Sequence, residues 1–429
     1  MNRVVFLFLF FLLWFFPFKI ENFENENIHY LEIAKNITSE IIHTAVKAEV
    51  KDSSEFNFSI SQVMLLRSTL SKLEDTHKQY LNTFNQNYHY SVIQINKEVN
   101  TYLAISEWEE VVNNFGGIKG IYLNSYDFLN LEKMKSIKSI LNETVVNTLV
   151  IDVKTDHGHL MYDSDVIESY ELNNEREKYN SESLRELKVN NNIYLIGRVV
   201  AFQDPLFAKR YIESSVYDSK TNSIFSMNGQ YFLDPGNKKS RDYVLNVAIE
   251  ACRLGFDEIQ FDYIRYPDSN NRNLVYGDES NFKNRTRNIN SFLLEATNIL
   301  HGEGCLVSAD IFGYVLQTKS DNGIGQHLET IVQSVDFVSP MVYPSHYSNG
   351  SFGYKYPNEH PYEVVSESLN DGLERGVSSK QLRPYLQGFW HSIEEVKLNI
   401  KAAEDKNLDW IIWNNSSMYD ENYFTKIES

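Results

Sequence analysis

The sequence predicts a (β/α)8 barrel, the TIM barrel fold, in which parallel strands close into a ring and helices surround it. From Gly116 onward, eight short apolar runs alternate with seven amphipathic stretches. Together they fill about 300 residues, which is the usual size of such a barrel. The rival is an open doubly wound sheet, but no glycine-rich phosphate loop follows the first strand.

The chain begins with a segment that is typical of a secretory signal. Arg3 supplies one early positive charge, and Val4–Phe16 follows without a polar residue. This apolar run is short for a membrane span, so we predict a signal peptide over residues 1–20. No small-residue cleavage site precedes Glu21, and membrane attachment through residues 4–20 is therefore the alternative. Either way, we expect a protein that is secreted or membrane-anchored on the extracytoplasmic side.

Residues 21–115 differ from the rest of the chain in their pattern of apolar and polar residues. Apolar residues recur there at helical spacing, interrupted by the polar stretch Lys51–Ser59. We expect a helical accessory or linker segment without catalytic residues. The barrel itself is expected to cover residues 116–424.

Within the barrel, strands and helices are expected to alternate along the chain. The expected strands are Lys119–Leu123, Thr148–Val153, Ile193–Val200, Glu258–Tyr263, Leu306–Ile311, Phe337–Tyr343, Pro384–Phe389 and Trp410–Asn414. The expected helices are Leu129–Leu141, Ser183–Val189, Arg241–Leu254, Phe282–Leu300, Gly325–Ser334, Pro361–Gly372 and Ser392–Lys406. The long insertion Gln203–Lys239 has turn signals at Asp218–Asn222 and at Asn228-Gly229, which predict a small hairpin over the barrel mouth.

The fourth strand carries the most informative pattern. Ile259, Phe261 and Tyr263 alternate with polar residues, two of which are acidic. Helical stretches flank this strand, so it is expected to be a buried parallel strand whose polar face points into the protein. Buried acids need partners or a function. The alternative is a half-exposed edge strand with a solvated face.

Composition limits the classes of function. The formal net charge is -18 and the acids are scattered along the chain, which argues against a nucleic-acid partner. Aromatic residues make up 14% of the chain, a content compatible with stacking against sugar rings. Cys252 and Cys305 either form a disulfide, which export would permit, or remain as buried thiols.

If the strands close, alternate residues point into the barrel. The residues expected inside are Asp152, Lys154, Arg198, Glu258, Gln260, Asp262, Ser308, Asp310, Ser339, Met341, Tyr343, Tyr385, Gln387, Ile412 and Asn414. An ordinary barrel interior is filled by Val, Ile and Leu, so this polar set indicates a functional site at the carboxyl ends of the strands. A structural network of ion pairs is the alternative.

The residue types narrow the chemistry. The histidines occur singly and without metal-ligand spacing, and no serine nucleophile elbow is present. We therefore expect no metal and no cofactor. Paired carboxylates near aromatic rings fit glycoside hydrolysis, which needs one acidic proton donor, one ionised carboxylate and a surface for the sugar.

Several motifs, in the same order, resemble those of a glycosyl hydrolase domain family once counted among domains of unknown function. The motifs are Ile151–Lys154, Arg198–Pro205, Gly255–Pro267, Ser308–Gly313, Ser339–Tyr347, Arg383–Gln387 and Trp413-Asn414. The resemblance covers residues from about Gly116 to about Tyr423 and implies a TIM barrel with glycoside hydrolase activity. It carries the family's acids onto Asp152, Asp262 and Asp310. Tyr385 departs from the family pattern, in which Trp is expected.

These observations predict an exported glycoside hydrolase that acts on a cell-wall or extracellular polysaccharide or oligosaccharide. Asp262 is expected to be the nucleophile or base, kept ionised by the positive charges of Arg198 and Lys154. Asp310 is the expected proton donor, with Asp152 or Glu258 as alternatives. The expected substrate-binding residues are Lys154, Arg198, Gln260, Tyr343, His346, Tyr347, Gln387, Trp390, Trp413 and Asn414.

Other interpretations remain open. The same barrel could bind glycan at the cell surface without cleaving it, and a metal-dependent hydrolase is disfavoured by the lack of a paired His set. Aromatic residues of Gln203–Lys239 and Pro344–Pro361 are expected either to form the walls of an open groove or to pack these loops onto the barrel. A groove would suit internal cleavage of a long chain. These aromatic residues are Tyr211, Tyr217, Phe225, Tyr231, Phe232, Tyr347, Phe352, Tyr354 and Tyr356.

Overall fold

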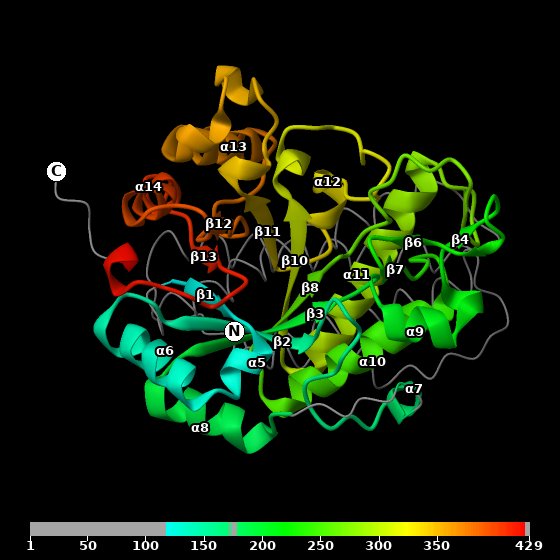
Figure 1. The fold of residues 1–429 in the computed structure, drawn as a ribbon, viewed down its shortest axis with the longest axis horizontal. Helices are drawn as coiled ribbons and strands as arrows, with labels where there is room; N and C mark the ends of the chain where they lie inside the picture. The colour runs from blue at the N-terminus through cyan, green and yellow to red at the C-terminus, as the bar shows by residue number, and fades with distance from the viewer. Residues whose placement is uncertain (1–116, 171, 173–177, 425–429) are drawn as a thin grey trace, which may run out of the picture. The chain divides into compact units, whose positions relative to one another are not determined.

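The computed structural model describes residues 117–170, 172 and 178–424, and these residues form a closed parallel barrel with helices outside the ring (Figure 1). The barrel strands are β1 (Lys119–Leu123), β2 (Thr148–Lys154), β3 (Tyr194–Val200), β8 (Glu258–Asp262), β10 (Leu306–Phe312), β11 (Phe337–Val342), β12 (Tyr385–Gln387) and β13 (Trp410–Trp413). Around the ring their order is β1, β13, β12, β11, β10, β8, β3 and β2. The predicted fold class is confirmed, and every predicted strand is present to within two residues at either end.

The predicted signal or anchor, residues 1–20, and the accessory segment, residues 21–115, lie outside the described residues. They stay predictions. In the part of the chain that the structure describes, no helix combines the length and the apolar character that crossing a membrane requires.

The helices begin and end where local residue chemistry allows. They are α5 (Ser125–Phe128), α6 (Leu131–Glu143), α7 (Ile167–Tyr170), α8 (Ser181–Asn191), α9 (Pro205–Arg210), α10 (Lys238–Leu254), α11 (Phe282–Glu303), α12 (Leu328–Ile331), α13 (Pro361–Glu374) and α14 (Ile393–Glu404). Asn237 and Asn281 cap the first turns of α10 and α11 by accepting backbone N–H bonds. Gly255 and Gly304 end the same helices in the left-handed conformation that favours glycine.

One predicted helix, Gly325–Ser334, is mostly absent, and only the four residues of α12 are helical. Gly325 has a φ of 81°, which no regular helix accepts. The side chain of Gln326 bonds with the barrel strand β10 instead, accepting from the Phe312 amide and donating to the Asp310 carbonyl. The segment before α12 is therefore a loop that buttresses the end of β10.

The insertion Gln203–Lys239 contains two hairpins rather than one. Their strands, and one strand from a later loop, are β4 (Tyr217–Asp218), β5 (Ser223–Ile224), β6 (Ser226–Met227), β7 (Gln230–Tyr231) and β9 (Leu274–Val275). Strand β4 pairs with both β5 and β9, and β6 pairs with β7. Both turns fall at the predicted positions, and the hairpins lie beside α9 in Figure 1.

Cys252 and Cys305 form a disulfide, which resolves the alternative left open by the sequence. Cys252 lies in the last turn of α10 and Cys305 directly precedes β10, with Cα atoms 5.9 Å apart. The bond ties the outer helix layer to the start of a strand that carries a candidate catalytic acid.

The lower part of the barrel interior contains polar groups that satisfy one another. Glu258 accepts from both terminal nitrogens of Arg383, at 3.0 Å for Nη1, and from the hydroxyls of Ser308 and Tyr194. Gln260, one step higher on β8, bonds with the hydroxyls of Ser339 and Tyr385. These groups are buried and hydrogen-bonded to one another, and they lie directly below the uppermost layer of the barrel interior. We call this set the floor; it comprises Tyr194, Glu258, Gln260, Ser308, Ser339, Arg383 and Tyr385.

Candidate active site

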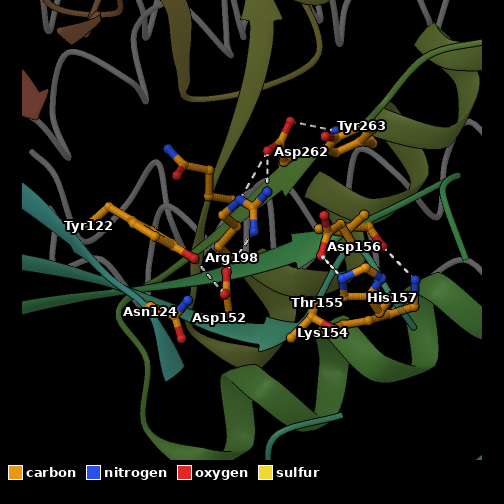
Figure 2. Close-up of polar contacts among 12 residues, drawn as sticks. Tyr122, Asn124, Asp152, Lys154, Thr155, Asp156, His157, Arg198, Asp262 and Tyr263 are labelled. Atoms are coloured by element: carbon orange, nitrogen blue, oxygen red, sulfur yellow. Dashed lines mark hydrogen bonds and ion pairs between the residues drawn. The ribbon is translucent and has the colours of Figure 1, made fainter. Parts of the chain in front are cut away.

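The uppermost layer of the barrel interior brings together acids from neighbouring strands. Asp262 ends β8, and Asp310 lies on β10, whose Ala309 is in register with Phe261 of β8. Asp262 and Asp310 therefore follow paired residues and lie side by side. Arg198 of β3 approaches Asp262 from the other side, and Figure 2 shows its guanidinium between Asp262 and Asp152.

Asp262 is surrounded by hydrogen-bond donors. Its Oδ2 accepts from Nε of Arg198 at 3.0 Å and from Nη2 at 2.5 Å, and its Oδ1 accepts from the Tyr263 amide at 2.6 Å. Three donors, two of them on a guanidinium, stabilise the ionised carboxylate. Asp262 is 7% exposed, so these donors act in a largely dehydrated place.

Asp310 has the opposite environment. It is 1% exposed, and no described residue donates a hydrogen bond to its Oδ1. Burial, followed by the negative charge of Asp262, raises the pKa of Asp310 well above its ordinary value. This carboxyl group therefore holds its proton at pH values where an exposed aspartate has lost it.

Hydrogen bonds and aromatic contacts hold the Arg198 side chain in position. Its Nη1 donates to Asp152 Oδ1 at 2.6 Å, and the hydroxyl of Tyr122 donates to Asp152 Oδ2 at 2.7 Å (Figure 2). Its guanidinium lies 5.1 Å from the ring centre of Trp413, which stacks on Tyr122 at 3.9 Å. Burial alone would lower the pKa of Arg198, but Asp262 and Asp152 outweigh it and raise this pKa. Arg198 is thus a permanent cation that orients Asp262.

Tyr263 follows Asp262 with a φ of 48°, in the left-handed region that non-glycine residues rarely enter. This conformation accompanies the contact between its amide and the Asp262 carboxylate. Backbone strain of this kind persists where surrounding structure enforces it, often at functional sites.

A cavity of about 570 Å³ opens above this layer. Nine residues singled out from the sequence line it: Arg198, Asp262, Asp310, Met341, Tyr343, His346, Tyr347, Tyr385 and Trp413. Asp152 does not line the cavity and contacts the site through Arg198. The structure therefore unites the two principal acids with a cation and aromatic walls, in an enclosure of the size that ligand pockets have.

Three other sequence-predicted residues lie elsewhere. Glu258, the alternative proton donor, and Gln260 belong to the floor described above. Lys154 was expected to face Asp262, but a bulge after Asp152, which pairs with Arg198, places Lys154 in register with Val199 instead of Val200. It therefore points outward, where its Nζ lies 2.9 Å from Asp204 Oδ2. That expectation is wrong because one extra residue in a strand reverses the direction of the next side chain.

The expected side-chain direction on the last strand is also wrong. Trp413, in register with Gln387, faces the interior, whereas Ile412 packs in the outer core. Asn414 donates to the Gly388 carbonyl, and Gln387 accepts from the amide and the hydroxyl of Ser345. These two side chains hold loops together and do not line the cavity.

Trp390 lies at the rim and is 81% exposed, with a φ of 58°. It does not line the cavity, but its ring meets that of Phe389 edge-on at 5.1 Å. Phe389 in turn contacts Tyr343, a wall residue. A role for Trp390 in glycan binding stays a prediction.

Most aromatic residues of the two long loops pack their own loops. Phe225 and Phe232 are buried in a small cluster with Val216. The ring of Tyr211 contacts that of Phe207 in a tilted arrangement, with ring centres 4.6 Å apart. Tyr354 stacks against His360, and only Tyr347 of the nine loop aromatics lines the cavity. Of the two arrangements expected for these residues, the structure agrees with packing of the long loops and not with opposed aromatic walls.

Sequence reasoning missed part of the lining. The missed residues are Tyr263, Arg265, Asp268, Phe312, Gly313 and Tyr314, which lie at or beyond the carboxyl ends of β8 and β10. The available signal was the place of Tyr263 and Arg265 in the family-like motif Gly255–Pro267 and of Phe312 and Gly313 in Ser308–Gly313. Asp268 and Tyr314 directly follow these motifs. Within the described residues, no group of three or more His, Cys, Asp or Glu side chains is arranged to hold a metal ion.

Comparison with known families gives this arrangement a context. A family model described as "putative glycosyl hydrolase domain" matches residues 120–419, about 70% of the chain. The chain belongs to this family. Membership of a glycosyl hydrolase family implies a carbohydrate substrate. No curated protein matches the sequence.

Two solved structures are similar to parts of this chain. A hypothetical protein from Ruminiclostridium thermocellum is 34% identical; the match covers 44% of this chain and 96% of that chain, with a TM-score of 0.40. The glycoside hydrolase domain of PgaB (BpsB) from Bordetella bronchiseptica is 11% identical and covers 70% of this chain and 94% of that chain, with a TM-score of 0.51. At that identity the likeness shows the shared fold alone.

Proposed function

We propose that this protein hydrolyses O-glycosidic bonds of a cell-wall or extracellular polysaccharide, with Asp262 as the ionised carboxylate and Asp310 as the proton donor. The observation that carries the proposal is the contrast between two neighbouring acids. Asp262 accepts three hydrogen bonds, whereas Asp310 is buried with an unpartnered oxygen and a raised pKa. Neighbouring carboxyl groups with opposite environments divide acid and base roles between them.

In this mechanism Asp310 donates its proton to the glycosidic oxygen as the bond from that oxygen to the anomeric carbon breaks. Asp262 either attacks the anomeric carbon directly, forming a glycosyl ester that water then hydrolyses as Asp310 takes up the proton of that water, or removes a proton from a water molecule that attacks the anomeric carbon. The two routes give opposite anomers of the first product, which NMR distinguishes. In either route the Arg198 guanidinium orients Asp262 before substrate arrives, so little reorganisation is needed during the reaction.

Asp310 is a better candidate for the donor than the two alternatives considered from the sequence. Asp152 accepts from Arg198 and Tyr122 and does not line the cavity. Glu258 is fully buried in the floor and paired with Arg383. Neither carboxyl group borders the space where a sugar would bind.

We further propose that the protein acts outside the cytoplasm. The disulfide between Cys252 and Cys305 supports this, because such bonds persist in oxidising compartments. Fractionation of the producing cell, combined with thiol labelling, tests the proposal. A cytosolic protein whose two cysteines both react with the label would contradict it.

The activity test uses the full-length protein, a panel of polysaccharides and mass spectrometry of the products. We expect cleavage of at least one polysaccharide by the wild type and none above background by Asp262→Asn. Asp163→Asn is the control, because the Asp163 side chain is 96% exposed and does not line the cavity. Glycan binding without any product would instead favour a binding barrel that has no hydrolytic activity.

A further inference from the structure

A second arginine lies in the cavity, beyond the catalytic layer. Arg265 follows Asp262 by three residues and lies between two aromatic rings. Its guanidinium carbon is 5.0 Å from the ring centre of Tyr263 and 4.8 Å from that of Phe312. Both distances are within the range of cation–π attraction, so the rings fix the position of the guanidinium. Tyr314 stacks on Phe312 and completes this wall.

The two cavity arginines differ in their partners. Arg198 is neutralised by Asp262 and Asp152. Arg265 makes no ion pair with a carboxylate of the described residues, and its one hydrogen bond runs from Nη1 to the Tyr266 carbonyl at 3.2 Å. A guanidinium has five N–H donors in a planar fork that matches a carboxylate, so Arg265 keeps donors for a ligand.

We propose that Arg265 binds a carboxylate on the sugar next to the cleaved bond, so that the substrate is an acidic glycan. The carboxylate can belong to a uronic acid or to an acidic substituent on a neutral sugar. This inference rests on the proposed function, because it assigns the substrate class of the same cavity. The position of Arg265 supports it, since Tyr263 adjoins Asp262 and Phe312 follows Asp310 by two residues.

The negatively charged groups around Arg265 do not prevent an anion from binding there. Arg198 offsets the charge of Asp262, and Asp310 is protonated in the proposed mechanism. Asp268 is exposed on the same cavity wall and makes no ion pair with a described residue. It can accept hydrogen bonds from sugar hydroxyls, while Arg265 offers a positive charge that no ion pair with a described residue neutralises. Tyr263 and Phe312 are turned toward Arg265, which distinguishes this wall from a surface that stacks on neutral sugars.

The test compares an acidic oligosaccharide with the same oligosaccharide after its carboxyl groups have been reduced to alcohols. For the wild type we expect kcat/KM to fall about 10–100-fold on reduction, the range for losing a hydrogen bond to a charged group. For Arg265→Gln we expect nearly equal values for the two substrates, with the loss mainly in KM. Arg272→Gln is the matched control, since Arg272 is exposed, lies on the same loop and does not line the cavity.

Arg265→Lys keeps the positive charge but lacks the planar set of guanidinium donors. This variant should prefer the acidic oligosaccharide over the reduced one to an intermediate degree, and it provides a second test if Arg265→Gln misfolds. Equal cleavage of both substrates by the wild type would overturn the inference and leave the proposed function intact. If no glycan is cleaved, calorimetric titration with the acidic oligosaccharide decides: binding lost in Arg265→Gln supports the subsite, and absence of binding by the wild type overturns it.

Discussion

Two aspartates of the same layer differ because of what surrounds them. Asp262 meets the Arg198 guanidinium and a backbone amide, and both favour a negative charge. For Asp310, burial and the charge of Asp262 favour the proton and outweigh the opposing positive charges of Arg198 and Arg383. The division of roles in the proposed mechanism follows from these neighbours, because the two side chains are chemically identical.

The raised pKa of Asp310 predicts how stability depends on pH. The unfolded chain loses this proton near the ordinary aspartate pKa of about 3.9, whereas the folded protein keeps it to higher pH. The contribution of Asp310 to the free energy of unfolding is therefore complete at low pH. It falls by up to about 1.4 kcal/mol per pH unit until the folded-state pKa is reached.

Asp310→Asn does not titrate, so its stability relative to the wild type should rise with pH over this window. Denaturant unfolding of both proteins at a series of pH values measures the difference. Asp163→Asn, at an exposed site, controls for the loss of one carboxyl group. A difference for Asp310→Asn that does not change with pH would show that Asp310 titrates normally.

At the residue scale, the sequence identified the right acids but not all of their partners. The alternation of polar and apolar residues along β8 could be recognised in the sequence, because Glu258, Gln260 and Asp262 alternate with apolar residues. Trp410–Trp413 contains only apolar residues, so its inward face could be known only from its register with β12. Lys154 was misplaced because no sequence signal announces the bulge before it.

At the scale of elements, the polar face of β8 has different roles at the start and at the end of the strand. Glu258 at the start of the strand contributes to stability, and Asp262 at its end contributes to the candidate site. The register of β8 with β3 and β10 places Arg198 and Asp310 within reach of Asp262. Strand pairing therefore builds the site, and the loops complete its walls.

Glu258→Gln tests the division between floor and site. The substitution leaves Arg383 charged and buried without its ionic partner, which should cost about 3–5 kcal/mol of unfolding free energy. Asp242→Asn is the control, because the exposed pair of Lys238 and Asp242 should contribute at most about 1 kcal/mol. Denaturant titration measures both variants.

The folded fraction of Glu258→Gln should retain most of its turnover, because Glu258 does not border the cavity. Loss of turnover at wild-type stability would mean that Glu258 takes part in the reaction, as the sequence alone allowed.

At the scale of the whole described chain, the fold was predictable and the cavity only partly so. Strand order and number followed from repeated strand and helix patterns, which local residue chemistry encodes. The loop before α12 departed from helix because Gly325 adopts a positive φ and Gln326 bonds with β10. Arg265 was missed because its importance comes from two rings, one of them on another strand, that only the folded barrel brings together.

The central claim is that Asp262 acts as the ionised carboxylate and Asp310 as the proton donor. The most direct measurement compares kcat/KM of the wild type, Asp310→Asn and Asp262→Asn on two substrates. One is an oligosaccharide that the wild type cleaves, and the other is a nitrophenyl glycoside of the same sugar. Nitrophenolate departs without a proton, whereas a sugar alkoxide needs one.

Asp310→Asn should therefore lose about 10²–10⁴-fold on the oligosaccharide and far less on the nitrophenyl glycoside, because only the first needs a proton donor. Asp262→Asn should lose activity on both substrates. Equal losses for Asp310→Asn on both substrates, or near wild-type turnover by Asp262→Asn, would contradict the assignment.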